Sequence, residues 1–534
     1  MSLDRCLFLA RAQRASEREA LAGRIERLAR WHGGTASWAR VGEHGVAGVV
    51  RYDEREEPLD GPVAFGETAT DGAGAILEVG PNRASLAGGA GGPGMLFSAA
   101  SDAIAAWSTH AVAAAWLAHG RARVDPAAIP EQLAAEFVGG DRSLIERARP
   151  LPLGVRVDVD DSGSRVEDRW PLAQRWAQLP EEEAAAHAEQ HLLESLERRA
   201  GRAPWASLTA GLDSRVVAVA LRDLGIQARG FTWGESEWDD VGGGADVARR
   251  LEMPHTLVGI EWLSDDDAMR GVQRQVRWNE GAIHVGFGRL EWPAGMRSFV
   301  TGAGGEIGRA FYYRDRAPAT EHAQPDQLAQ TLIDLLEPRL VGAKREARDG
   351  LAGSVRGWVD AAGSAGLSGW RTLDVVYGEQ RLRRWLRGML PRLDAPMIPA
   401  FSTPEIGRAL ASLPLDQRLS DGFHRGFLQR HAPELLPAAA RAPDRALRDR
   451  LPGRLRARPQ SPLGDRWQDH LEFRKWIADG VLGSELVTEP LGERWAARTR
   501  RRFLAGDGHA EGLALAAAGP VALAEALVEL ERDE

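Results

Sequence analysis

Residues 204–226, PWASLTAGLDSRVVAVALRDLGI, decide the fold of this 534-residue chain. The apolar run WASL leads through a Gly-containing turn into a stretch whose apolar residues recur at helical spacing. The next apolar stretch, ARGFTWG at 228–234, predicts a second strand. Strand, helix and strand in this order form a βαβ unit, so we expect an α/β fold built on a parallel sheet.

The turn between the first strand and the helix, TAGLDS at 209–214, has the composition of a phosphate-binding loop. Its backbone N–H groups lie at the positive end of the helix, where an anion is stabilised. Thr209 and Ser214 add hydroxyl donors, Gly211 permits close approach to the backbone, and Asp213 offers a hard oxygen ligand for Mg²⁺. An ordinary turn with an Asp or Ser helix cap explains this motif equally well when it is taken alone.

A second strand also runs directly into Gly-rich sequence. Residues 296–313, MRSFVTGAGGEIGRAFYY, place an apolar stretch before TGAGGEI at 301–307. The pair of loops resembles the ATP-binding signatures of the class B asparagine synthetase-like family. TAGLDS is similar to that family's pyrophosphate-binding loop, SGGxDS, and TGAGGEI is similar to its second signature, SGEGxDE. Two motifs in the right order favour the family more strongly than either motif alone.

The resemblance implies a set of site residues, with ATP and Mg²⁺ as cofactors. FTWG at 231–234 is similar to the short strand that lines the adenine in that family. Asp213 and Glu306 fall on the carboxylates that hold Mg²⁺ beside the pyrophosphate. The residues that the resemblance assigns to ATP are Ser207, Thr209, Ala210, Gly211, Leu212, Asp213, Ser214, Thr232, Thr301 and Gly302.

Ahead of residue 171 the pattern changes to short alternating stretches with Gly-rich turns, which predict an α+β half. An acidic helix is expected over 180–201, after a linker at 171–180. The remaining expectations for this half are strands in 45–52 and 74–80, a buried helix over 98–120 that ends at Gly120, and a strand, DDSG turn and return strand over 149–170.

The resemblance extends this pattern to two domains. It implies a degenerate Ntn-hydrolase-like α+β domain over 1–175, followed over 176–534 by an adenine-nucleotide α-hydrolase-like (PP-loop) α/β synthetase domain. The chain beyond residue 325 is expected to be largely helical. Two domains also suit a chain of this length.

The N-terminal half departs from a working glutaminase, which needs Cys as the first residue of the mature chain. Residue 2 is Ser, and Cys6 lies inside the chain, where we expect it to be a core residue. We therefore expect no glutamine hydrolysis, so the attacking nitrogen belongs to the acceptor substrate itself. A single cysteine also excludes an intramolecular disulfide and a cysteine-based zinc cluster.

The second loop departs from the family at Ala303, where asparagine synthetases carry Glu and β-lactam synthetases carry Tyr, a residue associated with deprotonating the attacking amine. By chemical type, Tyr377, Glu379 or Asp394 could take this role. Core packing at helical spacing is the alternative interpretation for Tyr377 and Trp385.

The late catalytic lysine of the family is also unmatched. Of 67 basic residues, only Lys344 and Lys475 are lysines, and both lie in charged helical segments where we expect them to be solvated. Arg456 and Arg458, in LRARPQSPLGDRW, could clamp the pyrophosphate, because guanidinium groups stabilise phosphate charge. Arg458 is taken as the catalytic candidate.

Bulk properties narrow the function class. Hydrophobic residues make up 44% and charged residues 27% of the chain, without an uninterrupted apolar run near the roughly 18 residues that a membrane helix needs. The charged N-terminus does not predict a signal peptide, so we expect a cytoplasmic protein. A net charge of −9 argues against nucleic acid as the main partner.

The best match within the family is the group of lasso-peptide macrolactam synthetases that lack the glutaminase cysteine. LTAGLDSR, GGEIGRAFYY and YGEQRLRRW look more like that group than like biosynthetic asparagine synthetases. Members of the group adenylate an Asp or Glu side chain and join it to the peptide's own N-terminus. The resemblance implies a precursor peptide and a leader-peptide protease or recognition protein as partners. The alternatives are a small-molecule amide or β-lactam synthetase, an asparagine synthetase-type enzyme, and a non-catalytic ATP- or peptide-binding protein.

Overall fold

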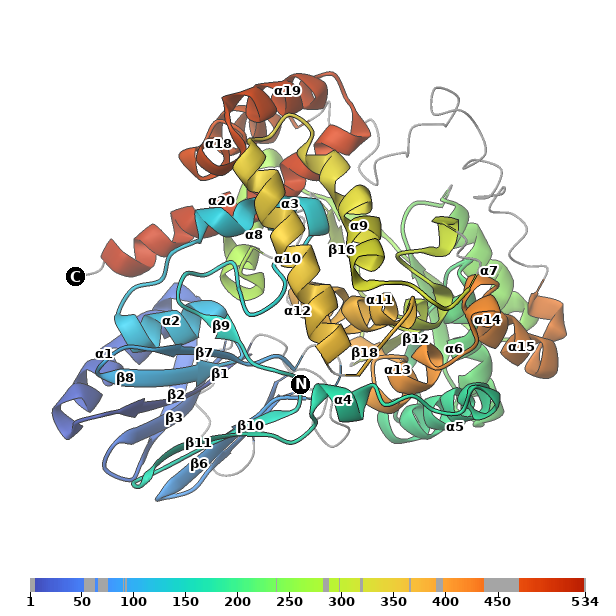
Figure 1. Ribbon diagram of the computed structural model, residues 1–534, viewed down its shortest axis with the longest axis horizontal. Helices are drawn as coiled ribbons and strands as arrows, with labels where there is room; N and C mark the ends of the chain where they lie inside the picture. The colour runs from blue at the N-terminus through green and yellow to red at the C-terminus, as the bar shows by residue number, and fades with distance from the viewer. Residues whose placement is uncertain are drawn as a thin grey trace.

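The computed structural model describes residues 5–51, 63–65, 75–89, 91, 94–236, 238–281, 288–296, 298–316, 320–364, 366–389, 397–436 and 470–532. These residues form a mixed α/β structure in which the strands make four sheets. Figure 1 shows two antiparallel sheets at the lower left and a parallel sheet at the right, among α6, α11 and α13. The predicted α/β class is therefore confirmed at this level.

Two antiparallel sheets in the N-terminal half pack face to face. The first has the order β2-β3-β1-β8-β7-β9, and the second has the order β11-β10-β6-β5-β4. Apolar side chains such as Leu7, Leu77 and Val157 fill the space between them. The strands are β1 (Arg5–Ala12), β2 (Thr35–Val41), β3 (Gly45–Arg51), β4 (Val63–Phe65), β5 (Ala75–Val79), β6 (Arg83–Ala87), β7 (Phe97–Ala100), β8 (Ile104–Ser108), β9 (Arg149–Pro150), β10 (Val155–Asp160) and β11 (Gly163–Asp168).

The predicted strands in 45–52 and 74–80 are confirmed as β3 and β5, and the predicted strand, turn and strand over 149–170 contains the β10–β11 hairpin. The other face of the six-stranded sheet, which carries Phe8 and Ala10, packs against α1 (Ala15–Trp31) and α2 (Ala111–His119). Alternate side chains of β1 therefore enter two different cores, as strand geometry requires.

The single helix predicted over 98–120 is wrong for its first half. Phe97–Ala100 and Ile104–Ser108 are the antiparallel strands β7 and β8, and only Ala111–His119 is helical. The Ser101 hydroxyl accepts hydrogen bonds from the N–H groups of Ala103 and Ile104, which closes the turn between the strands. Alanine-rich sequence fits either structure, and pairing of β8 with β1 decides in favour of the sheet. The predicted end at Gly120 is confirmed by its left-handed backbone, with φ of 68°.

The parallel sheet has the order β14-β13-β12-β17-β18, and all of its pairings are parallel. Its strands are β12 (Trp205–Ser207), β13 (Arg229–Trp233), β14 (His255–Val258), β17 (Phe299–Thr301) and β18 (Met397–Pro399). The predicted βαβ unit is confirmed as β12, α6 (Leu212–Asp223) and β13. The chain proceeds outward from β12 in one direction to β14 and in the other to β18. The order therefore reverses between β12 and β17, which is where ligands bind in open α/β sheets.

Helices dominate the rest of the chain, as predicted beyond residue 325, with β18 as a short exception. The predicted helix over 180–201 is α5 (Glu181–Arg199). The remaining elements used below or shown in Figure 1 are α3 (Ile129–Ala135), α4 (Leu172–Arg175), α7 (Asp239–Arg250), α8 (Asp265–Asn279), α9 (Pro325–Leu336), α10 (Arg345–Ser364), α11 (Arg371–Val376), α12 (Arg383–Met389), α13 (Pro404–Ala411), α14 (Leu415–Leu419), α15 (Gly422–His431), α17 (Leu471–Lys475), α18 (Glu485–Leu491), α19 (Glu493–Leu504), α20 (Gly508–Arg532) and the β15 (Ile260–Trp262)–β16 (Gly288–Leu290) pair.

The larger sheets change from antiparallel to parallel across the predicted boundary at 175, but the two halves share one core. The last helix, α20, returns to the N-terminal half, where the Trp31 indole N–H donates to the carbonyl of Ala526. Among the described residues, α20 is the one helix long and apolar enough to cross a membrane, and 72% of its apolar window is buried inside the protein. That burial agrees with the expectation that no segment spans a membrane.

Candidate active site

Two loops meet at the carboxyl ends of β12 and β17, on either side of the point where the strand order reverses. The first, at 209–214, leads from β12 into α6, and the second, at 302–306, leads from β17 into the short helix η3 (Gly305–Arg309). Positions far apart in sequence are thus brought together by parallel pairing of neighbouring strands. Both predicted motifs therefore lie at the position where open α/β sheets generally bind their ligands.

Ser214 fixes the shape of the first loop. Its hydroxyl lies 3.1 Å from the Thr209 hydroxyl and accepts a hydrogen bond from the Thr209 N–H at 3.2 Å. The Thr209 hydroxyl in turn accepts from the N–H of Gly211. Arg215 donates to the carbonyls of Ala210 and Gly211, so the carbonyls of the loop are held on the helix side. The loop is therefore a rigid turn at the positive end of α6.

The second loop packs directly against the start of α6, and glycine is required for this approach. A Cβ atom on Gly302 would lie 2.6 Å from Cβ of Asp213, and one on Gly305 would lie 2.3 Å from Oδ1 of Asp213. Gly304 has a φ of 96°, which favours glycine for conformational reasons as well. The glycines of TGAGGEI therefore bring Glu306 to the side of Asp213.

Asp213 lies at the centre of a polar cluster. Its Oδ2 accepts a hydrogen bond from Arg309 at 2.8 Å, and its Oδ1 lies 2.8 Å from Nε2 of the fully buried His424. Apart from this short contact with His424, Oδ1 has no hydrogen-bond partner among the described residues. Burial acts to raise the pKa of Asp213, but His424 and Arg309 outweigh it and hold the pKa below its usual value. Asp213 is thus an anion, with Arg309 against one oxygen and His424 against the other.

Glu306 has the opposite electrostatic balance. Burial raises its pKa, and the negative charge of Asp213 raises it further. The N–H of Gly304 donates to Oε2 of Glu306 at 3.2 Å, and Arg309 and the hydroxyl of Tyr377 act in the stabilising direction without cancelling the rise. Two partly buried carboxylates whose negative charges repel one another make a place where a cation is stabilised.

The residues present fit a Mg²⁺–ATP complex. Mg²⁺ is bound in nucleotide sites by one or two carboxylates together with substrate phosphates and water, so Asp213 and Glu306 are a sufficient protein contribution. Oδ1 of Asp213 is one of several buried polar atoms without a hydrogen-bond partner in the described parts of the chain. Clusters of three or more His, Cys, Asp or Glu side chains suited to hold a metal without substrate are absent from those parts. Asp213 and Glu306 are the two described carboxylates that would hold Mg²⁺ together with substrate phosphates.

The other residues assigned to ATP have mixed surroundings. Ser207 and Thr301 end the neighbouring strands β12 and β17 and are partly buried, and the Thr301 hydroxyl accepts from the N–H of Ala303. Thr232 is 1% exposed, and its hydroxyl donates to the carbonyl of Leu208. The structure therefore places Ser207 and Thr301 at the ends of two neighbouring strands, next to the two loops, whereas Thr232 joins β13 to Leu208, just before the first loop. The assigned residues that lie on the first loop, or on the second loop against it, are Thr209, Ala210, Gly211, Leu212, Asp213, Ser214 and Gly302.

The candidates for the general base fall in different places. Tyr377 begins the π-helical turn η6 (Tyr377–Leu382), packs against Phe311 and Tyr312, and reaches Glu306. Burial raises the pKa of Tyr377 well above its ordinary value, so in this state it is a neutral hydrogen-bond donor. Tyr377 is therefore packed in the core, as its alternative interpretation expected, and it also contacts Glu306.

Glu379 lies on the same turn but faces another partner. Its carboxylate forms a bidentate pair with Arg175, at 3.1 and 2.9 Å, and accepts a third hydrogen bond from the indole of Trp176. Burial acts to raise the pKa of Glu379, but Arg175 outweighs it and holds the pKa low. Glu379 therefore joins the region of the predicted linker to the helical part, and Asp213 and Glu306 are not among its partners.

Several sequence-predicted residues lie outside the described residues. They are Ser2, Asp394, Arg456 and Arg458. Both lysines, Lys344 and Lys475, are exposed as predicted. Lys344 donates a hydrogen bond to the carbonyl of Glu489. Cys6 is fully buried in β1, where burial raises the pKa of its thiol to about 12. The predicted core position of Cys6 is confirmed.

Sequence reasoning missed three residues around Asp213. Arg309 bridges Asp213 and Asp421, with 2.8 Å to each carboxylate, and His424 supports Asp213 from α15. Asp421 and His424 lie more than 200 residues beyond the first loop, and no local motif marks them. The run of glycines at 242–244 is a sequence signal of a different contact, the close packing of α7 on the first loop. A Cβ on Gly243 would lie 2.5 Å from Cβ of Ala210. These glycines let α7 pack on the first loop.

The chain matches no protein-family model and shows no significant match to a curated protein. The resemblance drawn from the two loops therefore depends on the residues themselves and on their placement in the fold.

Proposed function

We propose that this protein is an ATP-dependent, AMP-forming ligase that makes an amide bond. One observation carries the proposal: the two loops follow neighbouring parallel strands and bring Asp213 and Glu306 together at the positive end of α6. A Gly-containing turn before a helix suits the phosphates of ATP, and the paired carboxylates suit their metal.

In the proposed reaction a substrate carboxylate attacks the α-phosphorus of ATP and pyrophosphate leaves. An amine then attacks the activated carbonyl carbon, AMP leaves, and the amine loses a proton. Mg²⁺ held by Asp213 and Glu306 would neutralise charge on the phosphates. The loop at 209–214 would hold the pyrophosphate through backbone N–H groups and hydroxyls, and most of the catalysis would come from positioning and electrostatic stabilisation.

The surroundings of Asp213 give its neighbours definite roles. Arg309 and His424 keep its carboxylate ionised and fixed in direction. Asp421 holds the other side of the Arg309 guanidinium, so Arg309 stays in place when Asp213 turns toward a cation. Among the base candidates that the structure describes, Tyr377 is the one that reaches Glu306. We propose that Tyr377 orients the acceptor side of the site.

For the substrate we propose a ribosomal lasso-type precursor peptide, closed into a macrolactam between an Asp or Glu side chain and the N-terminal amine. The burial of Cys6, with its pKa raised to about 12, supports a reaction that does not draw ammonia from glutamine. A small-molecule amide synthetase uses the same ATP chemistry and remains an outcome of the test.

The test incubates purified protein with Mg²⁺-ATP and a candidate short precursor peptide from its gene neighbourhood, and follows AMP and peptide mass together. Loss of one water from the peptide with equal AMP formation is the expected result. Asp223→Asn is a matched control for Asp213→Asn, because Asp223 lies at the opposite end of α6 and pairs with Arg222 and His431. If a small carboxylate drives AMP formation and the peptide does not, the substrate belongs to the small-molecule class. If neither does, while ATP still binds, the protein is a non-catalytic binder.

A further inference from the structure

A cleft lined by arginines lies between α19 and the loop that leads into α10, on elements that contribute nothing to the site at β12 and β17. It has a volume of about 690 Å³, within the range of ligand-binding clefts. In Figure 1, α19 lies at the top of the molecule, well apart from α6 and β12. The cleft is lined by Val341, Gly342, Ala343, Arg348, Arg494, Ala497, Arg498 and Arg501.

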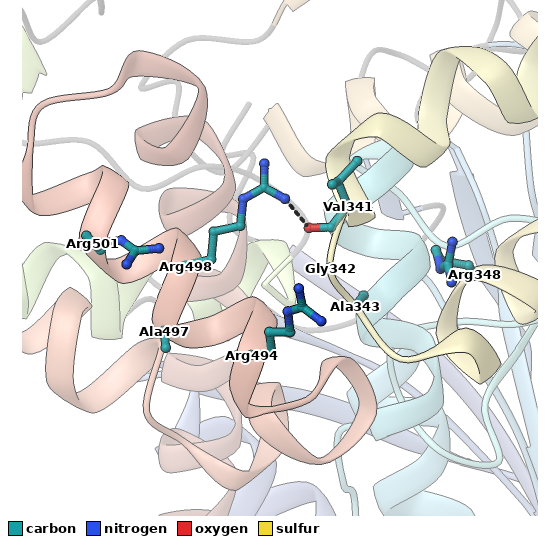
Figure 2. Close-up of a pocket in the computed structure, with 8 residues that line it drawn as sticks. All are labelled: Val341, Gly342, Ala343, Arg348, Arg494, Ala497, Arg498 and Arg501. Atoms are coloured by element: carbon teal, nitrogen blue, oxygen red, sulfur yellow. Dashed lines mark hydrogen bonds between the residues drawn. The ribbon is translucent and has the colours of Figure 1, made fainter.

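Three of the four arginines come from one face of α19. Arg494, Arg498 and Arg501 are spaced by four and three residues, which places them side by side on a helix surface. Figure 2 shows these three on one side of the cleft, with Val341 and Arg348 on the other. Along the helix axis the row extends for about 10 Å. The row is thus long enough to meet several charged groups and too long for one phosphate.

Two of the cleft arginines, Arg494 and Arg501, differ from their neighbours on α19, whereas Arg348 on the far wall pairs with Glu337. Arg500 and Arg502 also belong to α19, and each is paired with a carboxylate, Asp479 and Asp507 respectively. Arg494 and Arg501 have no ion pair or side-chain hydrogen bond with any described residue, and none of the cleft-lining residues is acidic. Positive charge is therefore left without a counter-charge inside a concave surface, in a chain whose net charge is −9.

The far wall of the cleft adds backbone and apolar surface. Arg498 reaches across the cleft and donates to the carbonyl of Val341 at 3.0 Å, which fixes the spacing of the two walls (Figure 2). Val341 is 50% exposed, and Ala497 lies among the arginines. The first turn of α10, which begins at Arg345, adds the positive end of a helix next to this loop. Small apolar patches between cationic groups suit a chain with alternating acidic and small side chains.

We propose that this cleft binds an acidic stretch of a polypeptide partner in an extended conformation. Side chains on one face of an extended chain recur about every 7 Å, comparable with the spacing of Arg494, Arg498 and Arg501 along α19. Carboxylates pair with guanidinium groups in charge-assisted, often bidentate hydrogen bonds. Nucleic acid is disfavoured, because it needs a longer basic surface than one cleft on an acidic protein.

The test measures binding of a fluorescein-labelled ten-residue peptide with alternating Glu and Ser, next to the same peptide with Gln in place of Glu. Wild-type protein should bind the Glu peptide, and the affinity should fall as salt is raised. The Gln peptide should bind at least about tenfold more weakly, since it lacks the charges. The proposal is independent of the ligase reaction, so Asp213→Asn protein should bind the Glu peptide as well as wild type does.

The decisive variant is Arg494→Ala with Arg501→Ala, because both side chains are exposed and their removal leaves no partner unpaired. Binding should weaken by about tenfold or more. Its charge-matched control is Arg30→Ala with Arg356→Ala, two exposed arginines outside the cleft, which should change binding less than about twofold. Equal weakening in both doubles, or no binding of the Glu peptide, overturns the proposal. Binding of inorganic pyrophosphate or of a DNA oligonucleotide at these arginines, in place of the Glu peptide, also overturns the proposal. Thermal unfolding of both doubles checks that they are folded.

Discussion

Two regions of the molecule carry reactive side chains and surround them differently. In the N-terminal sheets, Cys6 lies fully inside the core, with Sγ 3.3 Å from the Ser108 hydroxyl and a pKa raised to about 12. At the carboxyl ends of β12 and β17, Asp213 stays ionised, is 16% exposed, and keeps one oxygen that, apart from its contact with His424, has no hydrogen-bond partner among the described residues. A group that is to react must be left accessible and in the right charge state. By this criterion the proposed ligase chemistry belongs to the parallel sheet.

The largest effect is expected from Asp213→Asn, which removes the charge and keeps the shape. In the proposed ligase, AMP formation should fall by about a thousandfold or more, because both the metal ligand and the partner of Arg309 are weakened. AMP release under saturating peptide is the measurement. The Asp223→Asn control should retain activity within about twofold, in keeping with the small value of exposed ion pairs. Equal activity of Asp213→Asn and wild type would contradict the assignment of the site to this sheet.

A smaller loss is expected for Glu306→Gln, about a hundredfold in the same assay. Its amide keeps a single oxygen ligand and relieves the repulsion from Asp213, so the protein should be at least as stable as wild type. Activity and thermal unfolding are measured on the same preparation. A variant that is active but less stable would show that Glu306 is a structural residue.

Ser214→Ala tests the first loop without touching charge. It removes the hydroxyl that accepts from the Thr209 N–H and contacts the Thr209 hydroxyl, and should raise KM for ATP by about tenfold. Ser195→Ala on α5 is the comparison, because that hydroxyl is also buried but accepts from Arg199, away from the loop. If both variants raise KM for ATP equally, the effect of Ser214→Ala would come from a general loss of stability and not from the loop.

The smallest effect on activity is expected for Cys6→Ala, which should leave the proposed reaction unchanged. In the folded wild type, the thiol should resist labelling at pH 8 and react only on unfolding, because its pKa is raised from 9.0 to about 12. A folded pKa above the unfolded one means that the contribution of Cys6 to stability is complete below pH 9.0 and is lost as the pH rises toward 12. Unfolding of wild type and variant across that range measures this difference. Loss of glutamine- or ATP-dependent activity in Cys6→Ala would contradict the comparison.

The parts of the fold that were predictable are those with strong local patterns. The βαβ unit at 204–234 has strand and helix periodicities in sequence, and parallel pairing then places the 301–307 loop beside it. The hairpin of β7 and β8 was mistaken for a helix, because its alanines fit both structures and its partner, β1, is about 100 residues away in the chain.

The site was predictable only where a motif reports on backbone geometry. Thr209, Gly211 and Asp213 belong to a turn whose shape is local, so they could be found. His424 and Arg175 could not, since each acquires its role by packing against a carboxylate about 200 residues away. Glu379 was proposed as a base by chemical type, and its pairing with Arg175 has no signal in the sequence.

The most direct test of the central claim is calorimetric titration with α,β-methylene-ATP, which carries the phosphates of ATP but cannot transfer AMP. With Mg²⁺, wild-type protein and Cys6→Ala should bind it with similar affinity, whereas Asp213→Asn should bind at least about tenfold more weakly. Removing Mg²⁺ with EDTA should weaken wild type to the level of Asp213→Asn. Binding that is indifferent to both Mg²⁺ and Asp213, or no binding at all, would contradict an ATP site at the carboxyl ends of β12 and β17.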